Sequence, residues 1–241
     1  MLKISKLNFS YGKNKVLKDI SLEIFDSGVY GLIGANGAGK STLLEVISTI
    51  RGSRFEGEID FNQISQKKNF NRFRQEIGIL FQNESLEEKL TVVETFNYFR
   101  SFYQNKSGFY TNDELLKIFN LYEHKNKLIR QLSGGLKQRV RIAVTCMNKP
   151  KLILLDEPTT GLDPMYRRDF WKVLQMIVQE NNVLILLSTH DMYELENYAK
   201  KIIYIDGGKI KAFDSVPNLL KFEKVDSLED YYLKMEGNIV K

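Results

Sequence analysis

The sequence predicts an α/β fold built around a mainly parallel β-sheet, and three observations predict it. After residue 150, short apolar segments alternate with amphipathic segments of helix length, which is the pattern of βαβ units. A glycine-rich turn at residues 34–41 follows an apolar strand and precedes a helix, the order that a phosphate-binding turn requires. From about 88 to 148 the pattern is helical. We therefore expect a single domain over residues 1–241, with this helical subdomain inserted in the α/β core and a short tail from about 213 to 241.

The first part of the chain predicts an antiparallel β subdomain. Apolar and polar residues alternate over residues 2–9 and again over 16–24, and Tyr11–Lys15 between them predicts a hairpin turn. Further short strands are expected at 29–33, 58–61 and 77–81. In the helical stretch, Thr91 and Glu94 have the spacing of a capping box, and a second helix is expected to begin near Asn112. Later strands are expected at 152–155, 183–188 and 202–206, and later helices near 165–180 and 192–200.

Composition limits the classes of protein that fit. The formal net charge is +5, but the basic residues are spread along the chain, so we expect no nucleic-acid partner and interpret short clusters at 66–68 and 166–168 as solvated faces. No stretch approaches the ~18 consecutive apolar residues of a membrane span. Cys146 is the single cysteine, which excludes an internal disulfide, and we expect it to be a buried hydrophobic residue in a cytoplasmic protein.

Residues 34–41 read Gly-Ala-Asn-Gly-Ala-Gly-Lys-Ser and match the P-loop pattern G-x-x-x-x-G-K-[ST]. Its glycines allow backbone N–H groups to approach phosphate oxygens closely, and the N-terminus of the following helix adds partial positive charge. Lys40 supplies a positive charge for the β- and γ-phosphates, and Ser41 supplies a hydroxyl ligand for Mg²⁺. The expected ATP-binding residues of this turn are Asn36, Gly37, Ala38, Gly39, Lys40, Ser41 and Thr42.

Two further motifs predict a complete triphosphate site. Asp156 and Glu157 follow an apolar strand, and ligands of open α/β sheets bind beyond the carboxyl ends of the strands. Asp156 is therefore expected to reach the phosphate-bound Mg²⁺, and Glu157 to accept a proton from an attacking water. Ser133, Gly134 and Gly135 precede a second helix and form a second anion site, which we expect to serve the nucleotide of a partner subunit in a two-fold dimer.

The order of these motifs resembles the ATP-binding cassette (ABC) ATPases, a class of P-loop NTPases. The resemblance rests on the Walker A motif at 34–42, Leu-Ser-Gly-Gly-Leu-Lys-Gln-Arg at 132–139 and Leu-Leu-Asp-Glu-Pro at 154–158, and covers the chain from Leu2 to about Lys211. It implies that Tyr11 stacks on adenine and that Gln82 senses Mg²⁺ as the Q-loop glutamine. It also implies that Asp163 lies at the dimer interface and that His190 contacts the γ-phosphate.

The same resemblance implies a function and its partners. ATP and Mg²⁺ would be held between two cassettes, with Glu157, His190, Lys40 and Gln82 as the catalytic residues. The chain would be a hydrolysing subunit, peripheral on the cytoplasmic face of the membrane, that drives a separate transmembrane permease. The signature sequence at 132–139 and Gly-Leu-Asp-Pro at 161–164 resemble those of the motor subunits of bacterial exporters of drugs, peptides or lipids, so we expect an exporter.

Three other classes of protein share parts of this pattern. Ribosome-acting ABC proteins carry two cassettes in one chain, whereas this chain has one. DNA-repair and chromosome proteins split the cassette with long heptad repeats, and no heptads separate Walker A from the signature here. A nucleotide-gated regulator without turnover would not need Glu157 and His190. Membrane association that depends on another protein would favour the transporter, and RNA-dependent sedimentation would favour the ribosomal class.

Overall fold

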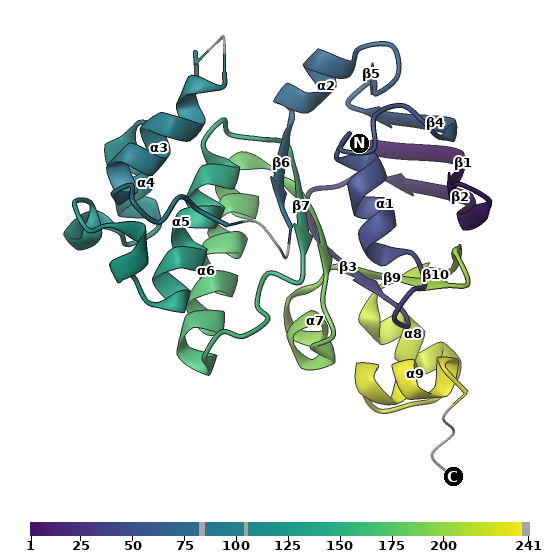
Figure 1. The fold of residues 1–241 in the computed structure, drawn as a ribbon. Helices are drawn as coiled ribbons and strands as arrows, with labels where there is room; N and C mark the ends of the chain where they lie inside the picture. Colours follow the sequence, from purple (N-terminus) through teal and green to yellow (C-terminus); the bar gives the residue numbers. More distant parts are fainter. Residues whose placement is uncertain (82–84, 104–105, 238–241) are drawn as a thin grey trace.

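The structure is a computed structural model that describes residues 1–81, 85–103 and 106–237. Its strands form two sheets (Figure 1), one of four strands in the order β2-β1-β4-β5 and one of six in the order β10-β9-β3-β8-β7-β6. The four-stranded sheet contains β1 (Leu2–Tyr11), β2 (Asn14–Ile24), β4 (Glu56–Phe61) and β5 (Ile64–Ser65). Both β2 and β4 pair with β1 in the antiparallel sense, and the pairing of β1 with β2 is the one that the alternating pattern predicts.

The six-stranded sheet is parallel except for its edge strand. Its members are β3 (Gly28–Ile33), β6 (Ile77–Leu80), β7 (Leu152–Asp156), β8 (Leu184–Ser188), β9 (Lys201–Asp206) and β10 (Lys209–Asp214). Only β10 runs antiparallel, against β9. Every residue of β3, β7 and β8 is buried, which explains why these strands are continuous apolar runs. The predicted α/β class with a mainly parallel sheet is confirmed.

The buried side chains form two cores, one on each face of the six-stranded sheet. Side chains alternate along β3, so that Val29 and Ile33 enter one core while Tyr30 and Leu32 enter the other. The second core also takes residues of α1 (Lys40–Ile47) and of the four-stranded sheet. The first core takes residues of α6 (Pro164–Asn181) and α7 (Met192–Tyr198). The carboxyl ends of the parallel strands therefore project from a sheet that is covered on both faces.

Three helices make up most of the expected helical stretch and occupy the left side of Figure 1. They are α3 (Val92–Ser101), α4 (Asn112–Ile118) and α5 (Gly134–Cys146), with short 3₁₀ turns at Tyr122–His124 and Ile129–Gln131. The capping box predicted at Thr91 and Glu94 is present, and the structure adds a second one at Thr111 and Glu114. Cys146 is buried, as expected, and burial raises the pKa of its thiol to about 12.

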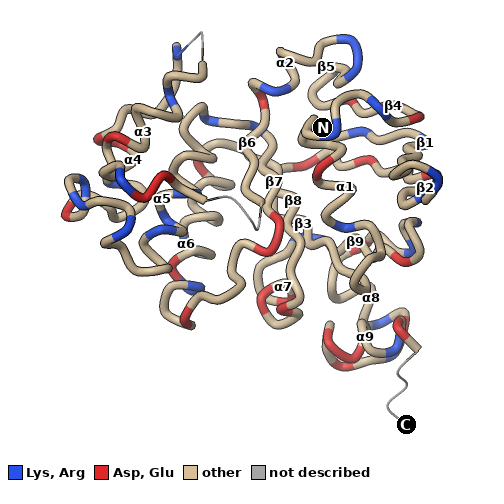
Figure 2. Tube along the Cα trace, viewed as in Figure 1, with Lys and Arg blue, Asp and Glu red and all other residues tan. Residues whose placement is uncertain are grey.

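Some elements were not expected from the pattern. These are the short helix α2 (Phe70–Gln75), the strand β5, and α8 (Val216–Glu223), which precedes α9 (Leu228–Met235) in the tail. The prediction that residues 66–68 form a solvated face was wrong for Gln66, which is fully buried and donates its amide to the Val46 carbonyl at 2.7 Å. The last carbonyls of α1 lack helical partners, and this amide satisfies one of them. Elsewhere Lys and Arg are spread along the described chain (Figure 2).

Candidate active site

The P-loop turns between β3 and α1 at the carboxyl end of the sheet. Gly34 (φ 149°) lies so close to β9 that a Cβ there would overlap the Ile205 carbonyl oxygen. A side chain at this position would push the turn off the sheet. The Gly208 N–H donates to the Ala38 carbonyl at 3.1 Å, which ties the turn to the β9–β10 hairpin as well. The phosphate-binding turn is thus fixed by two neighbouring segments before any ligand binds.

Lys40 lies in this turn with only 7% of its surface exposed. Its Nζ donates to the carbonyls of Gly34 at 2.6 Å and of Ala35 at 3.0 Å, so the ammonium lies across the loop. Burial lowers the pKa of Lys40, while Glu157, Asp156 and Glu236 act in the opposite direction. The buried Lys40 ammonium can pair with phosphate oxygens. The carboxylates around it can pair with a divalent metal ion bound to the same phosphates.

Asp156 and Glu157 end β7 beside this lysine. Asp156 is buried and accepts a hydrogen bond from the Ser188 hydroxyl of the adjacent strand β8. Glu157 has a left-handed backbone (φ 49°), and its N–H donates to the Ser188 carbonyl at 3.0 Å. This change of backbone conformation coincides with the end of β7 at Asp156.

The Glu157 carboxylate is held between two side chains. Its Oε1 lies 3.0 Å from the His190 Nε2, and its Oε2 accepts from the Thr160 hydroxyl at 3.2 Å. His190 follows β8, the strand next to β7 in the sheet. The structure therefore brings together the two residues that the sequence predicted as proton acceptor and phosphate contact. Both lie at the edge where Lys40 and Asp156 lie, which is the geometry that hydrolysis of a terminal phosphate needs.

Ser133 begins α5, and its hydroxyl accepts a hydrogen bond from the Leu136 N–H at 3.4 Å. Figure 1 shows α5 and α1 on opposite sides of β6 and β7. The N-terminus of α5 therefore does not complete the P-loop of its own chain. The two glycines differ: a Cβ on Gly134 would meet nothing within 4 Å, whereas one on Gly135 would overlap the Tyr166 ring. Gly134 is open to a ligand, and Gly135 is needed for packing against α6.

This difference predicts opposite behaviour of two alanine variants. Gly134→Ala should keep the melting temperature of the wild-type chain and lose most ATP hydrolysis, because its methyl group occupies the space open to a phosphate. Gly135→Ala should lower the melting temperature, since either α5 or Tyr166 must shift. Thermal unfolding and ATP turnover of both variants test this. Equal melting temperatures for the two would contradict the packing role of Gly135.

Tyr11 lies at the end of β1 and is 40% exposed. Its hydroxyl donates to the Glu45 carboxylate of α1 at 2.9 Å, and the Arg51 guanidinium carbon lies 4.9 Å from the ring centre. Glu45 also forms an ion pair with Arg51 at 2.8 Å. One face of the Tyr11 ring is thus already covered by a cation. Stacking of Tyr11 on adenine stays a prediction.

The remaining predicted residues have simpler outcomes. Asp163 is exposed at the position before α6, where another molecule can reach it. Gln82 lies outside the described residues. Among the described residues, no three His, Cys, Asp or Glu side chains group as a metal site. A magnesium ion here would be held by Ser41, Asp156 and phosphate oxygens, and these oxygen donors fit its preference.

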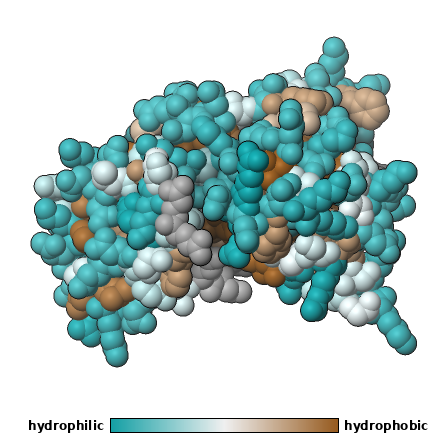
Figure 3. Space-filling model, turned by 90° about the horizontal axis from the view of Figure 1, so that it is seen from above, coloured by the Kyte–Doolittle hydropathy of each residue, from teal (hydrophilic) through white to brown (hydrophobic). Residues whose placement is uncertain are grey.

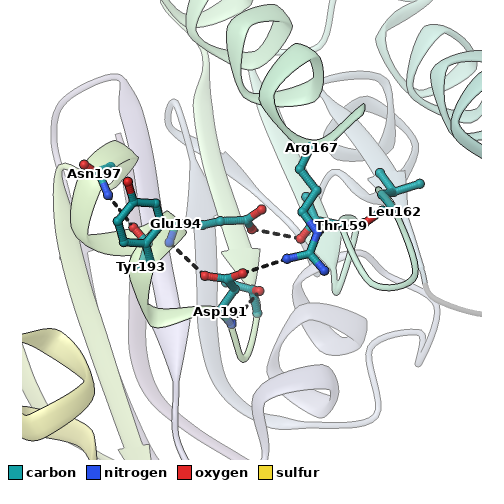
Figure 4. A network of polar contacts seen from close by, with 8 residues as sticks. Thr159, Leu162, Arg167, Asp191, Tyr193, Glu194 and Asn197 are labelled. Carbon is teal, nitrogen blue, oxygen red and sulfur yellow. Dashed lines mark hydrogen bonds and ion pairs between the residues drawn. The ribbon is translucent and has the colours of Figure 1, made fainter. Parts of the chain in front are cut away.

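The structure also shows polar residues at the site that the sequence interpretation missed. Gln138 is buried and donates to the Pro158 carbonyl at 2.6 Å, directly after Glu157. Arg167 was interpreted as part of a solvated face; its side chain is 38% exposed, but it also has fixed partners. Its side chain binds the Leu162 carbonyl and the Asp191 carboxylate (Figure 4). No pattern in the sequence marks these residues, because each has its partner on a different element.

Comparison with known proteins gives consistent results for the chain. The family model described as "ABC transporter" matches residues 17–160. The phosphonates import ATP-binding protein PhnC 2 of Oceanobacillus iheyensis is 34% identical, with 95% of both chains covered. The methionine import ATP-binding protein MetN of Clostridioides difficile is 33% identical over 87% of this chain and 67% of that protein. The daunorubicin resistance ATP-binding protein DrrA3 of Streptomyces coeruleorubidus is 32% identical over 95% of this chain and 72% of that protein.

Solved structures match the whole fold. An ATP-binding subunit of an ABC transporter superposes with a TM-score of 0.84 at 25% identity, covering 98% of this chain and 99% of that one. CbiO1 from Clostridium perfringens, part of the transporter complex cbiONQ, gives 0.79 at 29% identity over 92% of this chain and 91% of that one. A dimer of the ATP-binding cassette MJ0796, in a post-hydrolysis state with ADP and Pi, gives 0.75 at 27% identity over 89% of this chain and 98% of that one.

Proposed function

Because the chain belongs to the ABC transporter family and is an ATPase of that family, we propose that it powers a separate transmembrane permease by hydrolysing ATP between two cassettes. The observation that carries this proposal is the contact between Glu157 and His190, 3.0 Å apart at the sheet edge that also holds Lys40. Within the described residues, no helix combines the length and the apolar character needed to cross a bilayer.

The chemistry follows from the positions of the side chains. Lys40 lies across the turn where the β- and γ-phosphates would bind, and its charge stabilises the transferred phosphoryl group. Glu157 accepts a proton from the attacking water. His190, in the loop after the adjacent strand β8, holds both the Glu157 carboxylate and the γ-phosphate in place. Ser41 and Asp156 would hold Mg²⁺, which would supply charge neutralisation on the phosphate oxygens. Gln82 is the proposed sensor of the ion.

A second chain is proposed to complete the site. In Figure 1, α5 lies across β6 and β7 from α1, the helix that follows the P-loop, and a Cβ on Gly134 at the N-terminus of α5 would meet nothing within 4 Å. In a two-fold pair, each chain would present this turn to the triphosphate of the other, and Asp163 would lie near the shared interface. The dimeric form of a similar cassette supports this arrangement.

A groove between the sheet edge and the helical stretch is the proposed permease site. It is a cavity of about 570 Å³ bounded by α2, β6, α3 and α5. Phe99 and Phe102 line it, and Tyr98 packs edge-on against Phe102 with ring centres 5.0 Å apart. The surface in Figure 3 is mainly hydrophilic, with hydrophobic residues in separate patches, so an exposed aromatic cluster marks a specific contact. Membership of CbiO1 in a transporter complex supports a membrane partner.

A substitution in this cluster tests the groove without touching the nucleotide. Phe102 is 65% exposed, so Phe102→Ser should leave folding and the ATPase rate of the isolated chain near wild type. We expect it to lose most of its recovery with the membrane fraction when expressed with its native membranes. Phe222→Ser is the matched control, because Phe222 is 82% exposed on α8, away from the groove.

One outcome would contradict the groove as the permease contact, and another would contradict the transporter assignment. Equal membrane recovery of Phe102→Ser and Phe222→Ser would remove the groove from the permease contact. Sedimentation of the wild-type chain that RNase abolishes would instead favour the ribosomal class. The membrane protein that co-purifies with the wild-type chain would identify the permease.

We propose import as the direction of transport. The sequence predicted an exporter, whereas MetN and PhnC 2 are named for import and only DrrA3 among the three relatives is named for drug resistance. These names favour import, whereas the signature sequence at 132–139 predicted export. Uptake and efflux measurements on the reconstituted complex decide between the two.

A further inference from the structure

A buried carboxylate joins α7 to the segment that follows Glu157. Glu194 is 5% exposed, and its Oε2 accepts from the Thr159 hydroxyl at 2.9 Å, where Thr159 is 3% exposed (Figure 4). The two residues are far apart in sequence. Thr159 follows Glu157 in the segment after β7, and Glu194 follows His190 in the segment after β8. This hydrogen bond therefore connects the base of one loop to the base of the other in the buried interior.

A second connection runs through Arg167 on α6. Its Nε donates to the Leu162 carbonyl at 2.9 Å, and its Nη1 lies 2.8 Å from Asp191 Oδ2. The other oxygen of Asp191 accepts from the Glu194 N–H at 3.0 Å and so caps α7. The Arg167 guanidinium thus binds both the Leu162 carbonyl, in the loop before Asp163, and the Asp191 carboxylate, directly after His190.

Stability alone gives a weak reason for burying Glu194. Burial raises the pKa of this carboxyl, and Asp191 acts in the same direction, whereas Thr159, Trp171 and Arg167 lower it. Its Oε1 and the Trp171 indole Nε1 are both buried without a hydrogen bond of ordinary geometry. An apolar residue of similar size often stabilises such a position as well as a charged one does. A role in fixing the relative positions of two loops explains why a carboxylate is present.

Three contacts join the segment after β7 to the segment after β8. Glu157 meets His190, Thr159 meets Glu194, and Leu162 meets Asp191 through Arg167. We propose that Thr159, Glu194 and Arg167 are positioning residues that make segment 159–163 and segment 190–194 move as one unit. Docking of a second cassette against Asp163 then sets the place of His190 relative to Glu157 and the γ-phosphate. This inference rests on the proposed function, because it uses the roles assigned there to His190 and Asp163.

Two substitutions break the connections with little change of shape. Thr159→Val removes the hydroxyl and keeps the branched side chain, and Arg167→Lys keeps the charge but cannot reach two acceptors with one planar group. Each should lower kcat for ATP by ~10-fold, because small misplacement of a catalytic group is costly, while KM stays within about 2-fold. Thr159→Ser restores the hydroxyl and should restore kcat.

Thr95→Val is the matched control. Thr95 is fully buried, and its hydroxyl donates to the Thr91 carbonyl at 2.8 Å within α3, so the variant loses a comparable hydrogen bond far from both loops. A lower melting temperature with wild-type kcat is expected for it. If Thr159→Val and Arg167→Lys also keep wild-type kcat, or if Thr159→Ser fails to rescue, the positioning role is wrong.

His190→Ala separates failure of this inference from failure of the proposed function. A slow His190→Ala variant beside fast Thr159→Val and Arg167→Lys variants would overturn the positioning role alone. A His190→Ala variant that hydrolyses ATP at the wild-type rate would overturn the proposed role of His190 and this inference with it.

Discussion

Glu157→Gln is expected to bind ATP as the wild-type chain does and to hydrolyse it ~10²–10⁴-fold more slowly, a barrier increase of ~3–5 kcal/mol. Glutamine has the shape of glutamate, so it can keep the contacts to His190 and Thr160 that hold this side chain. It cannot accept the proton of the attacking water. Nucleotide affinity and folding should therefore be preserved while the chemical step is lost.

The measurement is ATP turnover beside nucleotide affinity from a binding titration. Glu23→Gln is a suitable control, because Glu23 lies in an exposed ion pair with Lys3 on the four-stranded sheet, away from the P-loop. Control and wild type should turn over ATP at the same rate. Near-normal hydrolysis by Glu157→Gln would contradict the assignment of the proton acceptor.

Lys40→Ala is expected to lose nucleotide binding itself, with the Kd for ATP rising by ~10²-fold or more. Charged hydrogen bonds to phosphate contribute ~1.5–3 kcal/mol each, and a loss of about 3 kcal/mol corresponds to this change. Lys40 is nearly buried and lies across the loop, so no neighbouring cation is placed to replace its ammonium within the described P-loop.

Binding of a fluorescent ATP analogue measures this effect directly. Lys172→Ala is the control, since Lys172 is exposed on α6 and has no place in the site. Its affinity should equal that of the wild type. An unchanged Kd for Lys40→Ala would refute the phosphate role of this lysine, whatever happens to hydrolysis.

The elements that position the site were predictable because their sequence signals are local. β3, β7 and β8 are buried on both faces and therefore read as apolar runs bounded by turns. The P-loop glycines and the Thr91 capping box are likewise set by the conformation of a few consecutive residues. The adjacency of Lys40, Asp156 and Glu157 follows from the general position of ligands at the carboxyl edge of such sheets.

The connections between loops were not predictable, because they depend on partners that are distant in the sequence. Gln66 and Arg167 occur in short polar clusters that resemble exposed turns, yet one supports the end of α1 and the other bridges two loops. Glu194 lies in a polar helix segment, and only the packing of α7 buries it against Thr159. The cation that covers Tyr11 also comes from a separate loop.

The central claim is that two copies of this chain hold each triphosphate between the P-loop of one and the Ser133–Gly135 turn of the other. A crystal structure of Glu157→Gln with Mg-ATP tests it most directly, because the variant should accumulate the bound state. The account predicts a two-fold dimer in which the Ser133 hydroxyl and the Gly134 N–H of one copy lie within hydrogen-bond distance of the γ-phosphate on the other. ATP bound at Lys40 with the Ser133–Gly135 turn remote from every γ-phosphate would contradict it.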